Sequence, residues 1–512
     1  MPTRSHHIEL TVDGESVTIE DTGGSLLEAL RDQLGARSPK DGCSPQGQCG
    51  CCTVLVDGQP RVSCVTPARR VRGRDVTTVD GLDDAAAWAE AMCATGGSQC
   101  GFCTPGIIVR LSALRAKYGG LDADRVTDAL KAHLCRCTGW QTVVEAAVEL
   151  PGADPSRDLD AASRRATIEG RSEQRVHPDV ALGAGGFADD SAPPGAEVAV
   201  RDQSGAWVRA QTLTAAREAA GKIQGRRTTQ ASEPPLHVPD GEWAVTLRTS
   251  WVEPAYLETD ASWAAPTEEP RTPLANGGAF GAKVTSEVVD EAARQAADAG
   301  GPVRVLASRE DTVRHGPKRP PMAAGIAADG TGIIEVARTP GIADAIGLVA
   351  PGVEVREVDL AGPPTSATIR GAGWVEAAVL LAAATGRESI TSPDGATATA
   401  RFDGTTIDVE VSCGRVLDAV VLRSYCIGAA HMAYSWVTSE SLTIEDGDVL
   451  DLTVRSFGVA RAVDTPEIRV ALGADDDTEP VNGSDAVFAA VAAAVWRHHG
   501  HAEVWPVLVS GD

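Results

Sequence analysis

Cysteines are the residues of this 512-residue chain whose number and spacing most clearly suggest chemistry. Ten of the 12 fall between Cys43 and Cys137, and only two occur in the long remainder of the sequence. Disulfides are disfavoured in a reducing compartment, and direct neighbours such as Cys51 and Cys52 are poorly placed to form them. Thiolate ligation of metal is therefore the chemistry that this crowding favours.

The first group of cysteines surrounds the sequence GCSPQGQCGCC. Cys43 is followed after five residues by Cys49, after two more by Cys52, and after a further eleven by Cys64. The glycines of this loop would let the chain curl around an inorganic cluster and point backbone N–H groups at its sulfides. A zinc ribbon is the alternative, and the unequal spacing disfavours it. We predict that these four cysteines bind one cluster.

The flanking segments predict the framework that must position this loop. Residues 8–20 and 53–63 each alternate between polar and apolar types around an Asp-Gly pair, which is the pattern of a β-hairpin. Residues 25–34 have helical spacing behind Ser25, a possible helix cap. Two hairpins and one helix predict a small β-grasp domain.

The second group consists of two close pairs, Cys100 with Cys103 in SQCGFCTPG and Cys135 with Cys137 in HLCRCTGW. Apolar residues recur at helical spacing in 107–118 and 124–134, between the two pairs. Two helices would then present two cysteine-bearing loops whose four sulfurs enclose one site. Taken alone, this group is also compatible with zinc.

Both groups resemble known iron-sulfur sequences. The first is similar to the plant-type ferredoxin loop, C-x4-C-x2-C with a distant fourth cysteine, although its first interval is one residue longer and Cys51 stands where a small residue is usual. Cys51 is thus a possible competing ligand. The two groups in this order resemble the iron-sulfur subunit of the molybdenum hydroxylases, the xanthine dehydrogenase and carbon monoxide dehydrogenase family, over residues 1 to about 150.

This resemblance implies two 2Fe-2S clusters, one in a ferredoxin-like domain at residues 1–82 and one in a four-helix domain at residues 83–150. It implies that the helical cluster lies nearer to the molybdenum cofactor. It also gives Gln99, the residue before Cys100, a hydrogen bond to the pterin. Without the motif, Gln99 would be taken for a loop residue that solvates its neighbours.

Residues 151–179 are polar and aperiodic, which is a linker composition. Beyond them, LANGGAFGAK (274–283), SREDTVRHGPKRPPM (308–322), IRGAGWVEAAVLLAAA (369–384) and residues 427–470 resemble, in order, segments of the molybdopterin-binding subunit. We therefore expect an α+β protein in which residues 180–512 form a shortened version of that subunit, with two subdomains that meet near residue 385. The cofactor-binding residues that the resemblance implies are Gln99, Gly277, Gly278, Phe280, Gly281, Arg370, Gly371 and Gly373.

The catalytic residue is left unassigned. The family carries a general-base Glu in a GxGE loop, and no such loop follows residue 470; Glu479 and Asp485 are the nearest carboxylates. Asp485 is better explained as part of a helix start, with Ser484 as cap. Val284, after Lys283, stands where several purine-oxidising relatives have an acidic residue, so purine chemistry is not supported.

Charge and hydropathy restrict the partners. Lys and Arg number 46 against 71 Asp and Glu, and the resulting formal charge of -25 would repel a phosphate backbone, so no nucleic-acid partner is expected. No apolar run approaches the roughly 20 residues that span a bilayer, and the first residues do not resemble a secretory signal. We expect a cytoplasmic protein without a transmembrane segment.

Together these features predict an oxidoreductase component of the molybdenum-hydroxylase type, passing electrons from a molybdopterin site through two 2Fe-2S clusters to an acceptor. No flavin domain is visible, so a separate flavoprotein subunit is the expected acceptor for electrons from a small-molecule substrate. In an alternative, residues 180–512 are a cofactor-free docking module for a separate catalytic molybdenum subunit. A zinc-stabilised adaptor without redox activity is the third hypothesis.

Overall fold

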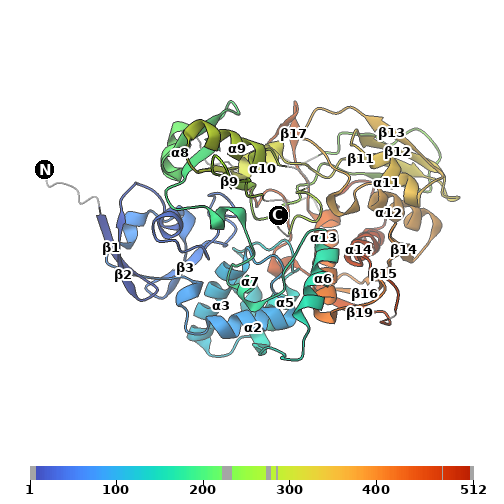
Figure 1. The fold of residues 1–512 in the computed structure, drawn as a ribbon. Helices are drawn as coiled ribbons and strands as arrows, with labels where there is room; N and C mark the ends of the chain where they lie inside the picture. Colours follow the sequence, from blue (N-terminus) through green and yellow to red (C-terminus); the bar gives the residue numbers. More distant parts are fainter. Residues whose placement is uncertain (1–6, 222–232, 273–277, 284–285, 476, 508–512) are drawn as a thin grey trace.

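The computed structural model describes residues 7–221, 233–272, 278–283, 286–475 and 477–507 (Figure 1). Its first domain is a sheet with strand order β2-β1-β5-β3-β4. These strands are β1 (His7–Val12), β2 (Glu15–Glu20), β3 (Thr53–Val56), β4 (Gln59–Val62) and β5 (Asp75–Thr77). Both predicted hairpins form, because Asp13-Gly14 and Asp57-Gly58 adopt the two positive φ angles that their tight turns require.

The helix predicted behind Ser25 is short. Ser25 caps α1 (Leu26–Glu28) by accepting a hydrogen bond from the Glu28 amide at 3.2 Å, and the chain continues as a wider π turn over Ala29–Gln33. The predicted β-grasp arrangement is confirmed.

Four helices follow, as predicted: α2 (Ala85–Thr95), α3 (Thr104–Tyr118), α4 (Ala123–Ala129) and α5 (Gln141–Glu149). α3 begins directly after Cys103 and has Pro105 in its first turn, where a missing N–H leaves no helical bond unmade. α4 ends sooner than the predicted segment 124–134. The amide of Leu134 instead donates to the carbonyl of Cys49 at 2.9 Å, so the rest of that segment forms the loop that leads to Cys135.

Residues 151–179, expected as a linker, contain a well-packed helix. α6 (Leu159–Gly170) lies against α13 (Ala419–Thr438), and α7 (Pro178–Ala181) follows it. The apolar pattern that would have revealed α6 is weak because its buried face carries an ion pair, Arg165 with Glu169, in which both side chains are fully buried.

The described chain after residue 180 forms three four-stranded sheets and a two-stranded ribbon. The first sheet has β6 (Glu197–Arg201), β7 (Trp207–Ala210), β9 (Ala261–Ala264) and β10 (Val303–Leu306), with α8 (Leu213–Ala219) and α9 (Glu287–Ala299). The second has β8 (Val245–Arg248), β11 (Met322–Ile326), β12 (Gly332–Ala337) and β13 (Val353–Val358), with α11 (Ile342–Val349) and α12 (Trp374–Thr385). The third has β14 (Ser389–Thr391), β15 (Thr397–Phe402), β16 (Thr406–Ser412) and β19 (Glu467–Leu472). α10 (Arg309–His315) and the ribbon of β17 (Ile444–Glu445) and β18 (Asp448–Val449) complete this region.

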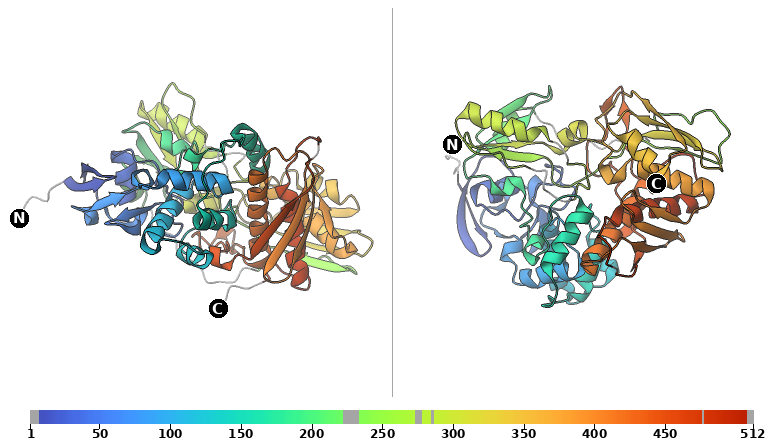
Figure 2. Two further views of the ribbon diagram at one scale, coloured as in Figure 1. Left: turned by 90° about the horizontal axis from the view of Figure 1, so that it is seen from below. Right: turned by 45° about the vertical axis from the view of Figure 1, so that its right-hand side comes forward.

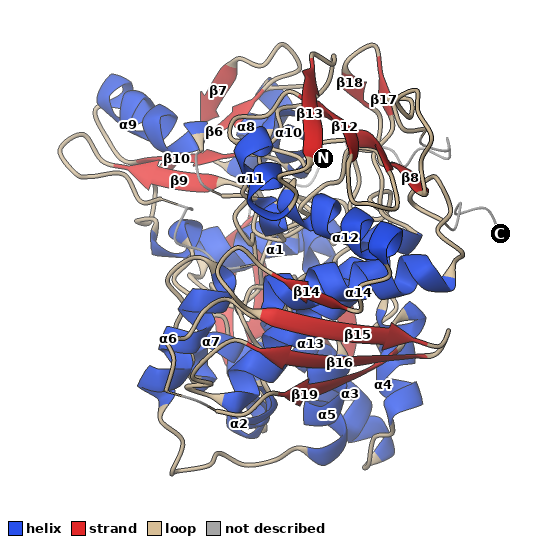
Figure 3. Cartoon of the chain, turned by 90° about the vertical axis from the view of Figure 1, so that its right-hand side faces the viewer, coloured by secondary structure: helices blue, strands red, loops and turns tan. Residues whose placement is uncertain are grey.

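The third sheet packs on α13 and α14 (Ser484–His498), and α12 lies on α14 (Figure 3). Residues 484–496 of α14 are all buried, which explains why their sequence is apolar on every side. The turned views show the first 150 or so residues, blue to teal, against both the green and the orange parts of the chain (Figure 2). The predicted α+β class is confirmed.

Two further predictions from the sequence concern the boundary near residue 385 and membrane-spanning helices. α12 ends at Thr385 and the third sheet starts at Ser389, close to the boundary expected near residue 385, although the domain limits themselves stay a prediction. Among the described helices, none is both long and apolar enough to cross a membrane.

Candidate functional site

The four cysteines of the first group lie together at one end of the β-grasp sheet. Cys52 directly precedes β3, and Cys64 lies in the helical turn Ser63–Val65 after β4, so the β3–β4 hairpin brings them side by side. Cys43 contacts Cys49 and Cys64, and none of the four is more than 4% exposed. The thiols of Cys49 and Cys64 hold the pKa of Cys43 well below its usual range.

The long first interval of this loop does not prevent convergence. Ser44 and Gly47 both adopt positive φ angles, 46° and 68°, and these two sharp turns return the chain to Cys43. The Gln46 amide donates to the sulfur of Cys43 at 3.1 Å. Such amide-to-sulfur bonds are one means by which a protein sets the potential of an iron-sulfur cluster.

The extra cysteine, Cys51, lies between the two groups. It is 1% exposed, its thiol faces Cys49, and it lies close enough to Cys135 of the second group to interact with it electrostatically. The Cys49 thiol favours the thiolate of Cys51, but burial and the neighbouring cysteines outweigh that effect and raise the pKa of Cys51. Cys51 therefore keeps its proton more readily than an exposed cysteine does.

The second group is equally compact and forms two pairs. The sulfurs of Cys100 and Cys137 are 3.6 Å apart, near the ~3.8 Å between two sulfurs bound about 2.3 Å from one tetrahedral metal. Cys103, at the start of α3, contacts Cys135. The Cys103 thiol, aided by Thr138, lowers the pKa of Cys135 to about 6. Two pairs of sulfurs match the two metal positions of a 2Fe-2S cluster.

The two cysteine loops are locked together. Besides the hydrogen bond from Leu134 to the Cys49 carbonyl, the side chain of His133 lies 3.3 Å from the hydroxyl of Thr53. Gly106 of α3 packs so closely on the first loop that a Cβ there would lie 2.3 Å from the carbonyl oxygen of Gly50. The two groups are thus neighbours through backbone contacts.

The predicted glycine loops meet beside the second group. Gly278, with φ 83°, lies on its sulfurs: a Cβ there would be 2.9 Å from Cys137 Sγ and 3.4 Å from Cys100 Sγ. The Arg370 amide donates to the Phe280 carbonyl at 3.1 Å, and a Cβ at Gly281 would strike the carbonyl oxygen of Thr368 at 2.1 Å. Gly277 and Val284 lie outside the described residues.

The polar groups of these loops are partly unpaired within the described structure. The Arg370 guanidinium lies 3.9 Å from the ring centre of Phe280, and its Nε and Nη2 atoms are buried without a hydrogen-bond partner there. Gln99 donates from Nε2 to Ser424 at 2.9 Å, while its buried Oε1 also has no partner in the described chain. Gly371 and Gly373 adopt positive φ angles and form the turn that starts α12.

Of the two carboxylates considered as general bases, one is paired with arginines and the other is exposed. Asp485 is buried and bonds to Arg370 at 3.0 Å and to Arg171 at 2.9 Å. Burial alone would raise the pKa of the Asp485 carboxyl, but the two guanidinium groups hold it below its usual value. Glu479 is exposed.

The prediction that Ser484 caps α14 was wrong. Ser484 is the first residue of that helix, and the preceding Gly483 occupies the cap position without a side-chain bond. Glu169 of α6 accepts the Gly483 and Ser484 amides at 3.0 and 2.8 Å, and Asn482 accepts the Asp485 amide at 2.9 Å. The part of this cap that Glu169 supplies, from more than 300 residues away, has no local sequence signature.

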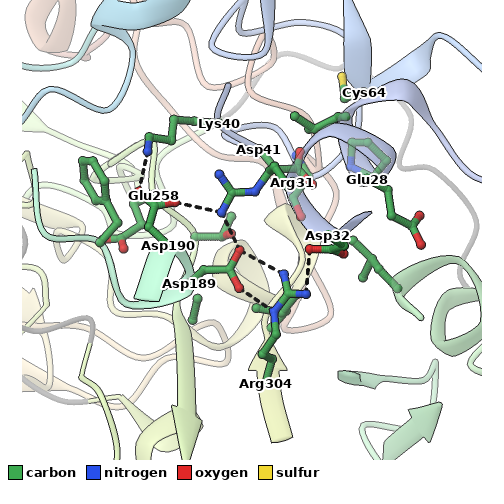
Figure 4. Close-up of a pocket in the computed structure, with 18 of the residues that line it drawn as sticks. Glu28, Arg31, Asp32, Lys40, Asp41, Cys64, Asp189, Asp190, Glu258 and Arg304 are labelled. Carbon is green, nitrogen blue, oxygen red and sulfur yellow. Dashed lines mark hydrogen bonds and ion pairs between the residues drawn. The ribbon is translucent and has the colours of Figure 1, made fainter. Parts of the chain in front are cut away.

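Sequence reasoning missed a charged pocket between the β-grasp domain and the first sheet of the later region (Figure 4). Arg31 bonds to both Asp189 and Asp190 at 2.8 Å, and Arg304 bonds to Asp189 at 2.8 Å. Lys40 also pairs with Asp190, and burial lowers the pKa of Lys40 to about 8. Cys64 lines the same cavity.

Glu258 also lines this cavity and is 6% exposed. Its Oε2 pairs with Lys283 at 2.7 Å, and its Oε1 has no partner in the described chain. Burial raises the pKa of Glu258 to about 7, although Lys283 opposes this effect. No motif includes Glu258, so only the fold could have revealed it.

Buried ion pairs fasten the later region to the cysteine loops. Arg136, between Cys135 and Cys137, bonds to both oxygens of Glu440 at 2.6 and 2.7 Å and donates to the Pro254 carbonyl at 2.9 Å. Arg309 donates to the carbonyl of Gly42, next to Cys43, at 2.6 Å. Residues after 180 are therefore an integral support of both cysteine groups.

Comparisons with known proteins agree with this geometry. The family model described as a 2Fe-2S iron-sulfur cluster binding domain matches residues 10–76, and the model described as a 2Fe-2S binding domain matches residues 78–148. The small subunit of nicotine 6-hydroxylase from Paenarthrobacter nicotinovorans is 37% identical over 154 residues, 30% of this chain and 93% of that subunit. The iron-sulfur-binding subunit of Escherichia coli O157:H7 xanthine dehydrogenase is 35% identical over 147 residues, 28% of this chain and 92% of that subunit.

A structural comparison extends the likeness to the later region. The aldehyde oxidoreductase of Desulfovibrio gigas matches with a TM-score of 0.72 over 98% of this chain and 99% of that chain, at 15% identity. The two proteins therefore share a fold that includes residues after 180. The chain carries two 2Fe-2S cluster binding domains, and it belongs to the molybdenum hydroxylase family of xanthine dehydrogenase and aldehyde oxidoreductase.

Proposed function

We propose that this chain carries electrons from a molybdopterin site, through the second cysteine group and then the first, to a flavoprotein acceptor. A 2Fe-2S cluster bound at each group would accept and release one electron at a time. The observation that carries the proposal is the hydrogen bond from the Leu134 amide to the Cys49 carbonyl at 2.9 Å. Leu134 directly precedes Cys135 of the second group, and Cys49 belongs to the first group. The two proposed cluster sites are therefore linked by short covalent segments and this one hydrogen bond.

The residues beside the second group fit a polar heterocycle such as a pterin. Gln99 Oε1 and two nitrogens of Arg370 are buried and unpaired in the described structure, and buried polar groups ordinarily have partners. Gly278 and Phe280 would bring the backbone close to such a group. When bound, a molybdenum cofactor would supply the two-electron oxidation of a small molecule.

The substrate class follows only from the relatives. Their names include an aldehyde oxidoreductase and hydroxylases or dehydrogenases of nicotine, nicotinate and caffeine. We infer that aldehydes and N-heterocycles are the compounds to test first.

The alternative, a cofactor-free docking module, has one observation in its favour. Asp485 is held by two arginines, so it is not available to take a proton from a reacting group. General-base assistance is worth about 10²- to 10⁴-fold, and a chain without it would depend on a partner subunit for turnover.

The test is to purify the chain with and without its co-expressed neighbours and to measure molybdenum, pterin and dye reduction. The proposal expects the pterin to be retained by Gln99 and Arg370, and lost in Gln99→Ala. A chain without pterin that still docks to a separate molybdenum subunit would establish the alternative. Robust turnover by the isolated chain, lost on Asp485→Asn, would show that Asp485 acts as the general base despite its two arginine partners.

A further inference from the structure

One cysteine of the first loop is not among the eight proposed ligands. Cys51 stands where a small residue is usual in the loops that this one resembles. Its side chain is 1% exposed and contacts Cys49 of the first group. Cys103 and Cys135 of the second group lie close enough to interact with it electrostatically. Cys51 is therefore at the junction of the two proposed cluster sites.

The sulfur of Cys51 shares a small buried space with the sulfur of Cys49. A Cβ at Gly42 would lie 3.1 Å from Cys51 Sγ and 3.2 Å from Cys49 Sγ, so both sulfurs border the same point. The two side chains are in hydrogen-bonding contact. The carbonyl oxygen of Cys49 is also near, but it is 3.9 Å from Cys51 Sγ, which is a long contact. Cys49 Sγ is therefore the better-placed acceptor.

This contact is shielded from solvent. Gly42 is buried, and the ring of Phe102 from the second cysteine loop closes the same space, with its Cε1 3.3 Å from the position of a Cβ at Gly42. Phe102 is itself 6% exposed. A hydrogen bond in such surroundings is electrostatically stronger than one in water, so a single donor here can have a measurable effect.

Iron binding would fix the direction of this hydrogen bond. A sulfur bound to iron is a thiolate, which has no proton to donate. Cys51 is not among the proposed ligands, so its S–H is the donor and Cys49 Sγ is the acceptor. Hydrogen bonds to the sulfurs of a cluster are one of the means by which a protein sets the reduction potential. A donor stabilises the more negative, reduced form and therefore raises that potential.

We propose that Cys51 raises the reduction potential of the first cluster by donating a hydrogen bond from its thiol to the cluster-bound sulfur of Cys49. This inference rests on the proposed function, in which the first group receives electrons from the second. Each transfer moves one electron, so that the second cluster is oxidised and the first is reduced, without bond or proton transfer. A higher potential at the first cluster favours this direction. Because the one thiol proton is directed at Cys49, the second cluster should keep its potential.

The experiment is a redox titration of the full-length protein, followed by electron paramagnetic resonance so that the two clusters are measured separately. It needs no substrate and no pterin. Cys51→Ala removes the donor and restores a small side chain, whereas Cys51→Ser keeps a donor at the same position. Cys93→Ala is the matched control, because it removes a partly buried thiol of α2 whose electrostatic neighbours include Arg157 and Asp418.

The readout is the ratio of reduced to oxidised first cluster, at the potential that half-reduces it in the unmodified protein. We expect Cys51→Ala to lower this ratio about fivefold, the ordinary effect of one hydrogen bond. That change corresponds to a shift of about 40 mV to lower potential. Cys51→Ser should return the ratio to within about twofold of the unmodified protein, and Cys93→Ala should leave it unchanged. The second cluster should titrate identically in all four proteins.

An unchanged first-cluster potential in Cys51→Ala would overturn the inference. Equal shifts in Cys51→Ala and Cys51→Ser would do the same, and so would an equal shift in the control Cys93→Ala. Loss of the first cluster in Cys51→Ala, together with its retention in Cys52→Ala, would show instead that Cys51 is itself a ligand.

The same titrations separate this inference from the proposed function. Absence of clusters from the unmodified protein would defeat both. Two clusters without the expected shift in Cys51→Ala would defeat only the role of Cys51. The expected shift in a chain whose clusters take no electrons from a molybdenum site would contradict only the proposed function.

Discussion

The buried pair of Arg136 and Glu440 should decide how firmly the second cluster is held. The two side chains are 7% and 1% exposed and make two charge-assisted hydrogen bonds of 2.6 and 2.7 Å. Glu440→Gln keeps the shape of the side chain but leaves the Arg136 charge buried without a counter-ion. Breaking such a pair typically costs about 3–5 kcal/mol, so we expect a loss of unfolding free energy of that order.

The assay is guanidinium unfolding followed both by circular dichroism and by visible absorption of the clusters. Because Arg136 stands between two cluster ligands, the absorption should bleach at lower denaturant in Glu440→Gln. The double variant Arg136→Met/Glu440→Leu should lose less than the sum of the single changes, since neither charge then remains unpaired. Arg338→Met, which breaks an exposed pair with Asp359, is the control and should leave the midpoint unchanged.

Two results would refute this reasoning. One is a Glu440→Gln protein whose midpoint and bleaching match the unmodified chain. The other is a double variant as unstable as the two single losses added together, which would mean that the two side chains do not interact.

Three further predictions follow from the same structure. Gly106→Ala should lower the free energy of unfolding by about 1–3 kcal/mol, because its Cβ would lie 2.3 Å from a backbone oxygen of the first cysteine loop. Gly120→Ala is the control and should be neutral in the same denaturation assay, because a Cβ there has nothing within 4 Å. Cys51→Ala should leave both cluster signals intact in electron paramagnetic resonance and Cys52→Ala should abolish one; the opposite pattern would shift the ligand assignment by one residue. Glu258 has a pKa raised from 4.5 to about 7, so the folded state binds the extra proton and the stability from this group falls as pH rises through that window. Relative to Glu258→Gln, the unmodified protein should lose up to about 3 kcal/mol of unfolding free energy between pH 4.5 and 7. Unfolding free energies that change with pH in parallel in the two proteins would contradict the assignment.

The clustering of the cysteines was predictable because the members of each group are close in sequence or are joined by a short turn. The spacing of Cys43, Cys49 and Cys52 within one loop, and the Asp-Gly turn that returns Cys64, are local features. The structure brings together the sulfurs that the spacing grouped. The meeting of Gly278 and Phe280 with Arg370 was predictable only through the resemblance, since about 90 residues separate them.

The charged contacts between distant segments had no sequence signal. Arg31 bonds to Asp189 and Asp190, about 160 residues away, and a lone Arg in a helix gives no indication of its partner. α6 was taken for a linker because Arg165 and Glu169 occupy its buried face and remove the apolar periodicity. Patterns of apolar residues cannot reveal a helix that is packed through an ion pair.

The most direct test of the central claim is the iron and labile-sulfide content of the purified chain. Eight cysteines arranged in two groups of four predict four iron and four sulfide per chain, in two clusters with distinct electron paramagnetic resonance signals after reduction. Stoichiometric zinc with no labile sulfide would contradict the account and identify the chain as an adaptor without redox activity.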